Sequence, residues 1–150
     1  MTTDSHIQMD RKAWMGVLAR AKPDALTALM PADLPVASLL RAPEIGSVMV
    51  RGRVGATGAP FNLGEVTVTR CALRLPCGTV GHGHVQGRDR DHARHAALID
   101  ALMQTDRAEA IREQVLTPLA TAETAARNTR AAKAAATKVE FFTLVRGEDK

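Results

Sequence analysis

The sequence predicts an α+β fold in which an antiparallel sheet is packed with helices. Two observations lead to this prediction. Several short segments in the first 90 residues alternate apolar and polar side chains, and turn-forming glycines and prolines separate them. Most of the remaining chain is rich in alanine and places its larger apolar residues at helical spacing.

The strand candidates follow one another closely enough to form a β-meander. They cover residues 36–40, 45–54, 63–75 and 79–86. Pro43 is expected to end the first, because proline cannot donate to a strand ladder. A Gly-rich hairpin loop at 55–60 and a Pro-Cys-Gly turn at 76–78 join the others. Short connections between sequential strands favour antiparallel pairing.

An N-terminal helical arm is predicted over residues 10–34, after a mostly polar segment, residues 1–9, that is expected to be flexible. Asp10 is the expected N-cap, and Pro23 suits the first turn of a second short helix. Trp14 has little apolar sequence around it, so it is expected either in the core of this chain or against another subunit.

The next helix is predicted to begin after Asp89, a good N-cap residue. Its larger side chains are expected to face the sheet and its alanines at 97 and 101 to lie outside. The expected sheet-facing residues are His95, Leu98, Ile99, Leu102 and Met103. A long helical segment at 107–136 is interrupted at Pro118, and Glu123 and Arg127 are expected to pair on its surface. Its predicted apolar stripe comprises Ile111, Val115, Leu119, Ala122 and Ala126. A last strand at 139–145 is expected to return to the meander.

The bulk properties favour a single domain over residues 1–150. The net charge of +4 permits an anionic partner without requiring one. Two cysteines, no signal peptide pattern and no apolar run of membrane-spanning length predict a cytoplasmic protein. The alanine-rich composition predicts a thin core, with part of the stability supplied by partners.

Four of the five histidines fall between residues 82 and 95, which raises the alternative of a self-sufficient metalloenzyme. His82 and His84 share one face of a strand, and His92 and His95 are neighbours on a helix. No further ligand stands at metal-binding spacing, so the sequence favours no metal site. Cys71 is expected to be a core cysteine rather than a thiolate paired with one of the strand histidines.

Arg88 and Arg90 lie at the strand-to-helix turn that starts at Gly87. Free backbone N–H groups and the helix dipole favour an anion at such a turn, and arginine side chains suit phosphate or phosphonate. These two residues are therefore the candidate substrate-binding residues. The competing interpretation is an ordinary capped helix with a local ion pair.

A second alternative is a small basic nucleic-acid-binding module on the C-terminal helix. Its candidate residues are Arg127, Arg130, Lys133 and Lys138. No aromatic residues that could stack on bases are interleaved with them, so a solvated helix face is the simpler interpretation.

Several stretches, in order along nearly the whole chain, follow the pattern of a known family: Trp14-Met15, 55–58, 63–70, 78–81, 85–89, 92–93, 97–103 and 137–147. In these stretches the chain resembles the PhnG family of the bacterial carbon–phosphorus lyase system. In this family positions 82 and 84 are often aromatic, which suits packing positions better than metal ligands.

The resemblance implies an accessory subunit of a transferase complex with PhnH-, PhnI-, PhnJ- and PhnL-like subunits, in paired copies. The complex would transfer an alkylphosphonate to C1′ of the ribose of MgATP, release adenine and form α-D-ribose 1-alkylphosphonate 5-triphosphate. Catalysis would reside mainly in the PhnI-like partner. MgATP would be a co-substrate of the complex, with no cofactor bound by this chain itself, and no catalytic residue is carried over to it.

Overall fold

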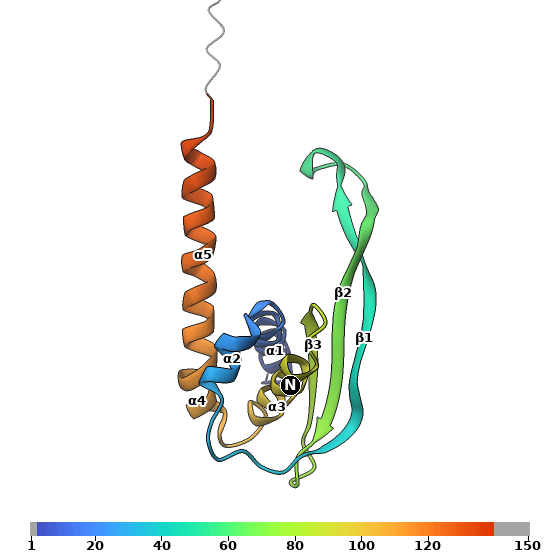
Figure 1. Cartoon of the computed structure of the whole chain (residues 1–150), viewed down its shortest axis with the longest axis vertical. Helices are drawn as coiled ribbons and strands as arrows, with labels where there is room; N and C mark the ends of the chain where they lie inside the picture. The colour runs from blue at the N-terminus through green and yellow to red at the C-terminus, as the bar shows by residue number, and fades with distance from the viewer. Residues whose placement is uncertain (1–2, 140–150) are drawn as a thin grey trace, which may run out of the picture.

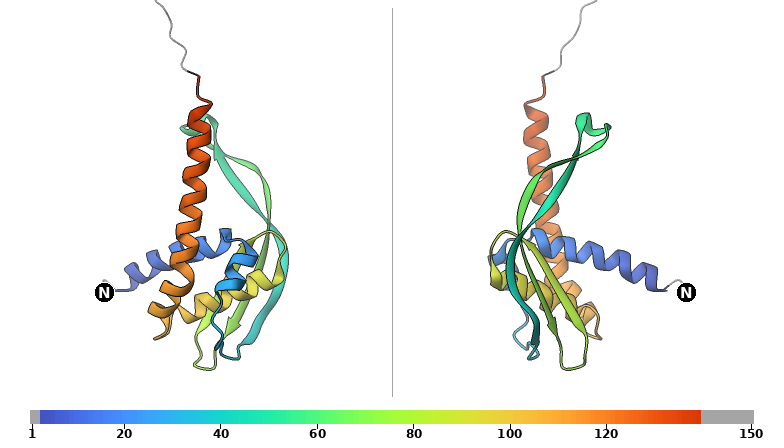
Figure 2. Two further views of the ribbon diagram at one scale, coloured as in Figure 1. Left: turned by 60° about the vertical axis from the view of Figure 1, so that its left-hand side comes forward. Right: turned by 90° about the vertical axis from the view of Figure 1, so that its right-hand side faces the viewer.

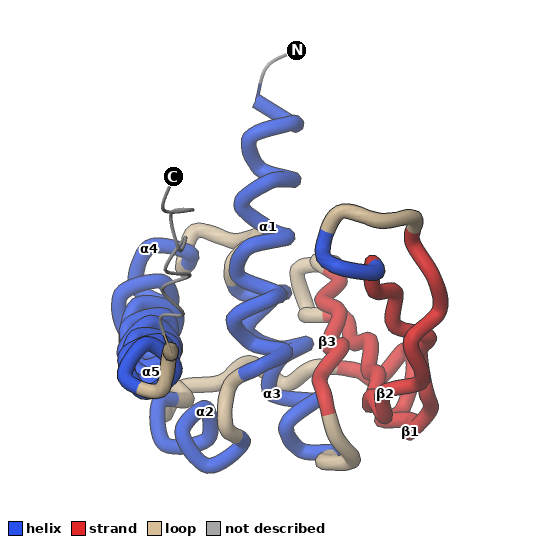
Figure 3. The backbone as a smooth tube through the Cα atoms, turned by 90° about the horizontal axis from the view of Figure 1, so that it is seen from above, coloured by secondary structure: helices blue, strands red, loops and turns tan. Residues whose placement is uncertain are grey.

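The computed structural model describes the backbone of residues 3–139 and the side chains of residues 10–139. Three strands form one sheet in the order β1-β2-β3, and the helices lie on one side of it (Figure 1, Figure 3). The elements are α1 (Thr3–Arg20), α2 (Pro23–Leu29), β1 (Ser38–Arg53), β2 (Pro60–Arg74), β3 (Val80–Gln86), α3 (Arg90–Leu102), α4 (Ala108–Ile111) and α5 (Thr117–Ala136). The predicted α+β architecture is confirmed.

The predicted meander is also confirmed, because β1 pairs with β2 and β2 with β3, both antiparallel. The prediction that Pro43 separates two strands was wrong. β1 continues through it, with a register irregularity between Arg41 and Glu44. β1 lies at the edge of the sheet, where a missing N–H donor is tolerated.

The helical arm differs from the prediction at its start. α1 begins at Thr3, so Asp10 lies inside the helix instead of capping it. Trp14 is buried in the core of this chain, at 6% exposure, and does not depend on another subunit for cover. α2 begins at Pro23 as predicted.

The face that α3 turns to the sheet is the opposite of the one predicted. Ala93, Ala97 and Ala101 are fully buried against β3, where Gly81 and Gly83 present no side chains. A Cβ added at Gly81 would lie only 2.7 Å from the Ala101 Cβ. Alanine opposite glycine lets the helix backbone lie directly on the strand, which large side chains would prevent.

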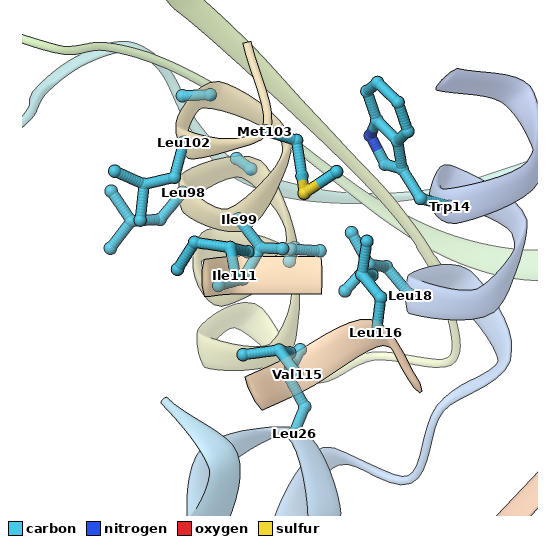
Figure 4. Close-up of a cluster of buried hydrophobic side chains, with 14 of the residues drawn as sticks. Trp14, Leu18, Leu26, Leu98, Ile99, Leu102, Met103, Ile111, Val115 and Leu116 are labelled. Carbon is cyan, nitrogen blue, oxygen red and sulfur yellow. The ribbon is translucent and has the colours of Figure 1, made fainter. Parts of the chain in front are cut away.

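The large residues of α3 instead meet the other helices. Figure 4 shows Leu98, Ile99, Leu102 and Met103 gathered with side chains of α1, α2 and the segment 111–116. The contributors from these elements are Trp14, Leu18, Leu26, Ile111, Val115 and Leu116. Cys71, Leu73, Leu75 and Val85 add the inner face of the sheet to the same core, so α3 is buried on both sides.

Two arms extend from this body (Figures 1 and 2). One is the outer half of the β1–β2 hairpin, which has no β3 partner beyond Val68. The other is α5, which follows a single π-helical turn, Arg112–Leu116, just before Pro118. The predicted apolar stripe of this helix is buried as far as Leu119, whereas Ala122 and Ala126 are exposed.

The predicted strand at 139–145 lies outside the described residues, apart from Val139. Among the helices that the structure describes, none combines the length and the apolar character that crossing a membrane requires.

Candidate functional site

The strand-to-helix turn is fixed to the sheet by its central glycine. Gly87 has φ +94°, a conformation that favours glycine. Its N–H donates to the Thr67 carbonyl at 2.9 Å, and its carbonyl accepts from the buried Thr69 hydroxyl at 2.8 Å. Both partners belong to β2, so the position of the turn is set by the sheet.

Asp89 then caps α3, as the sequence predicts. Its Oδ1 accepts from the His92 N–H at 2.9 Å. Arg88 and Arg90 flank this cap and are exposed, and no described residue forms an ion pair with either of them. The structure thus presents two exposed guanidinium groups at the N-terminus of a thirteen-residue helix, beside the carboxylates of Asp89 and Asp91.

The two histidine pairs are not brought together. His82 and His84 are exposed on the face of β3 that looks away from α3, because Gly81, Gly83 and Val85 occupy the other face. The helix pair lies on the far side of the strand. Within residues 10–139, no group of three histidine, cysteine or acidic side chains is placed to hold a metal ion.

His92 is a core residue rather than a candidate ligand. It is 2% exposed, and its Nε2 lies 2.9 Å from the Leu18 carbonyl, which requires this nitrogen to carry the proton. His95, predicted to face the sheet, is instead half-buried near Thr27, with Nδ1 3.3 Å from the hydroxyl. Burial lowers the pKa of His95.

The strand histidines belong to a shallow cationic depression on the outer face of the sheet. His84 is opposite Arg70 across the β2–β3 ladder, and Arg41 lines the same depression. Glu44 lies within 4 Å of both arginines, at 3.9 Å from Arg41 and 3.7 Å from Arg70. This carboxylate offsets part of the positive charge, and the separations correspond to weak, solvent-exposed pairs.

The cysteines have separate environments. Cys71 points into the core at 2% exposure, on the opposite face of the sheet from the strand histidines, so it is the predicted core cysteine. Burial raises the pKa of its thiol. Cys77 is exposed in the turn before β3, and its hydrogen bond with the Thr79 hydroxyl, at 3.3 Å, lowers the pKa of the thiol.

One buried polar residue, Asp100, is not among the site residues predicted from the sequence. This carboxylate is fully buried within α3 and accepts from Arg11 at 2.7 and 3.1 Å, from the Trp14 indole at 2.9 Å and from the His82 N–H at 2.9 Å. It joins α1, α3 and β3, so its role is structural. An aspartate between the apolar Ile99 and Ala101 was the signal available in the sequence.

Two of the cations considered for nucleic-acid binding, Arg127 and Arg130, lie beside other charged or polar groups of the fold. Arg127 pairs with Glu123 at 3.2 Å, as the helical spacing predicts, and Arg20 of α1 pairs with the same carboxylate at 2.7 Å. Arg130 lies on the rim of a groove between α5 and the end of α1. Gln86, at the end of β3 just before the Gly87 turn, lines the same groove.

Known proteins match this chain over nearly its whole length. Residues 9–147 match the family model described as "Phosphonate metabolism protein PhnG". A relative from Rhizobium meliloti (strain 1021) is 46% identical over 99% of this chain and 96% of its own length. Its name is "Alpha-D-ribose 1-methylphosphonate 5-triphosphate synthase subunit PhnG". Because the family model covers residues 9–147 and a relative shares 46% identity over 99% of the chain, the chain belongs to the PhnG family of phosphonate metabolism proteins.

Proposed function

We propose that this chain is an accessory subunit of a cytoplasmic synthase that transfers an alkylphosphonate to C1′ of the ribose of MgATP. Adenine leaves, and α-D-ribose 1-alkylphosphonate 5-triphosphate is formed. PhnH-, PhnI-, PhnJ- and PhnL-like subunits are the proposed partners, with the PhnI-like subunit carrying most of the catalysis. The observation that carries the proposal is the 46% identity, over 99% of this chain, to a relative named as a subunit of α-D-ribose 1-methylphosphonate 5-triphosphate synthase.

The projecting hairpin supports a role in assembly. Its apolar side chains are exposed on both faces, with Val54 at 69% and Leu63 at 68% exposure. Further exposed members are Ile45, Val48, Met49, Val50, Phe61 and Val66. A two-stranded hairpin is marginally stable in water by itself, and contiguous exposed apolar residues mark protein interaction sites. A subunit that is covered in a complex accounts for both features.

Co-purification tests this assignment. The chain is expressed together with the PhnH, PhnI and PhnJ counterparts of its own genome, with an affinity tag on the PhnI counterpart. We expect this chain to be retained in a fixed ratio through size-exclusion chromatography. Recovery of the tagged complex without this chain would contradict the proposal.

We further propose that Arg88 and Arg90 contact an anionic group of substrate or product in the assembled complex. The turn supports this because its backbone is held by β2 while both guanidinium groups remain unpaired among the described residues. Each side chain is exposed, so neither is needed for folding. In this proposal Arg88 and Arg90 bind the anionic group, and the PhnI-like subunit catalyses formation of the new bond.

Arg88→Ala is expected to lower phosphonate transfer by the reconstituted complex by about tenfold, the loss of one charged hydrogen-bonding contact. Arg112→Ala, an exposed arginine outside this turn, is the matched control and should leave the rate unchanged. Adenine release, followed by chromatography, is the measurement. Equal rates for Arg88→Ala and wild type would contradict a contact between Arg88 and the substrate or product.

A further inference from the structure

A groove of about 570 Å³ runs between α5 and the junction of α1 with α2. Its floor is apolar and made of small or medium side chains: Val17, Ala21, Ala25, Leu119, Ala122 and Ala126. Its rim carries Arg20, Lys22, Arg127 and Arg130. All of these residues lie within the described part of the chain.

The small floor residues fit a helix better than an extended segment. Ala122 and Ala126 are one turn apart on α5, and Val17 and Ala21 are one turn apart across the groove. Helices pack with axes about 8–10 Å apart where small side chains meet, so an entering helix would have neighbours on both sides. The last three turns of α5 also continue beyond the body without packing of their own, and an isolated helix of this length is marginal in water.

The rim determines the charge of the occupant. Four cations face one carboxylate, Glu123, so positive charge is in excess. The hydrogen bond from Arg20 lowers the pKa of Glu123, which therefore remains ionised between two arginines. Lys22 and Arg130 form no ion pair with any described residue, so they remain available to acidic groups on an entering segment. Positive charge around an apolar floor is complementary to an amphipathic helix with an acidic border.

We propose that this groove binds an acidic amphipathic helix of a partner subunit of the synthase. The inference rests on the proposed function and adds to it the surface and the chemistry of the docked segment. The apolar residues of that helix contact the alanines of the floor, and its carboxylates pair with the rim cations. No residue of the outer half of the hairpin lines the groove, and α5 and the hairpin extend from the body as two separate arms (Figure 1).

Two neighbouring alanines of α5 offer a matched test. Ala126 lies in the floor of the groove, whereas Ala125 is exposed and does not line it. Ala126→Glu places a carboxylate where an acidic helix docks, and Ala125→Glu makes the same substitution outside the groove. Both residues are exposed in this chain, so both variants should fold equally well, which circular dichroism and thermal melting verify.

Each variant competes with tagged wild-type chain during co-expression with the partner subunits, and mass spectrometry measures its share in the purified complex. We expect Ala126→Glu to be depleted about tenfold or more, because like charges in an interface are strongly unfavourable. Ala125→Glu should remain within about twofold of wild type. Equal incorporation of the two variants would overturn the groove assignment while leaving the proposed function intact.

Failure of the wild-type chain to join the complex would instead contradict the proposed function, and the present inference with it. A photo-crosslinking amino acid at position 126 tests the chemistry of the occupant. The cross-linked peptide is expected to belong to a net acidic helix of one of the partner subunits. A cross-link to a basic segment, or to a second copy of this chain, would overturn the proposal.

Discussion

The contact between β3 and α3 yields the sharpest stability prediction, for Gly81→Ala. The added Cβ would overlap the Ala97 carbonyl oxygen and lie 2.7 Å from both the backbone nitrogen and the Cβ of Ala101. Carbon atoms pack best about 3.5–4.0 Å apart, so the helix would have to retreat by roughly 1 Å. The obstacle is largely backbone and cannot rotate away, unlike the end of a flexible side chain.

Overpacking of a core costs about 1–3 kcal/mol, and a rigid obstacle places Gly81→Ala near the top of that range. For a chain of this size, a loss of about 3 kcal/mol lowers Tm by roughly 6–12 °C. Gly64→Ala is the matched control, because a Cβ there meets nothing within 4 Å. Gly64→Ala should change the free energy of unfolding by less than about 1 kcal/mol. The change should be towards greater stability, because alanine restricts the backbone of the unfolded chain more than glycine does.

Urea unfolding followed by fluorescence suits the measurement, because Trp14 is the only tryptophan and is buried. Its indole N–H donates to Asp100, so its emission reports the packing of α1 on α3. Similar unfolding midpoints for Gly81→Ala and Gly64→Ala would refute the reasoning, since they would mean that α3 does not lie directly on β3.

Three further predictions concern the polar and titratable groups. Asp100→Asn replaces an acceptor with a group that also donates, among partners that only donate, and should cost about 2–4 kcal/mol in the same urea assay. In the native chain, iodoacetamide should modify Cys77, whose pKa is lowered by Thr79, well before the buried Cys71; in urea both should react at similar rates, as mass spectrometry can verify. Burial lowers the pKa of His95 below its ordinary 6.5, so just below pH 6.5 the unfolded chain binds more protons than the folded one. The free energy of unfolding should therefore fall as the pH drops below about 6.5. Thermal melts at about pH 7.5 and about pH 5.5 should show a smaller loss for His95→Gln than for wild type.

Patterns among residues close in sequence predicted most of the secondary structure. The meander, the Pro23 helix start, the Asp89 cap and the pairing of Glu123 with Arg127 depend on residues close in sequence, and each is confirmed. The candidate turn was found for the same reason: glycine, arginine and aspartate at a strand-to-helix junction are a local signal. Whether that turn binds an anion is a property of the assembled complex and stays a proposal.

The sequence by itself determined the class of fold, the order of the elements and, through its likeness along the chain, the family. Only the tertiary structure decided which side of α3 meets the sheet, because a helix buried on both faces has no single apolar side to read. It also separated the strand histidines from the helix histidines, because His82 and His84 lie on the face of β3 that points away from α3. The hydrogen bonds from Arg11 and Trp14 to Asp100 span 89 and 86 positions, and the groove brings α5 beside the junction of α1 and α2. No local pattern acts over such separations.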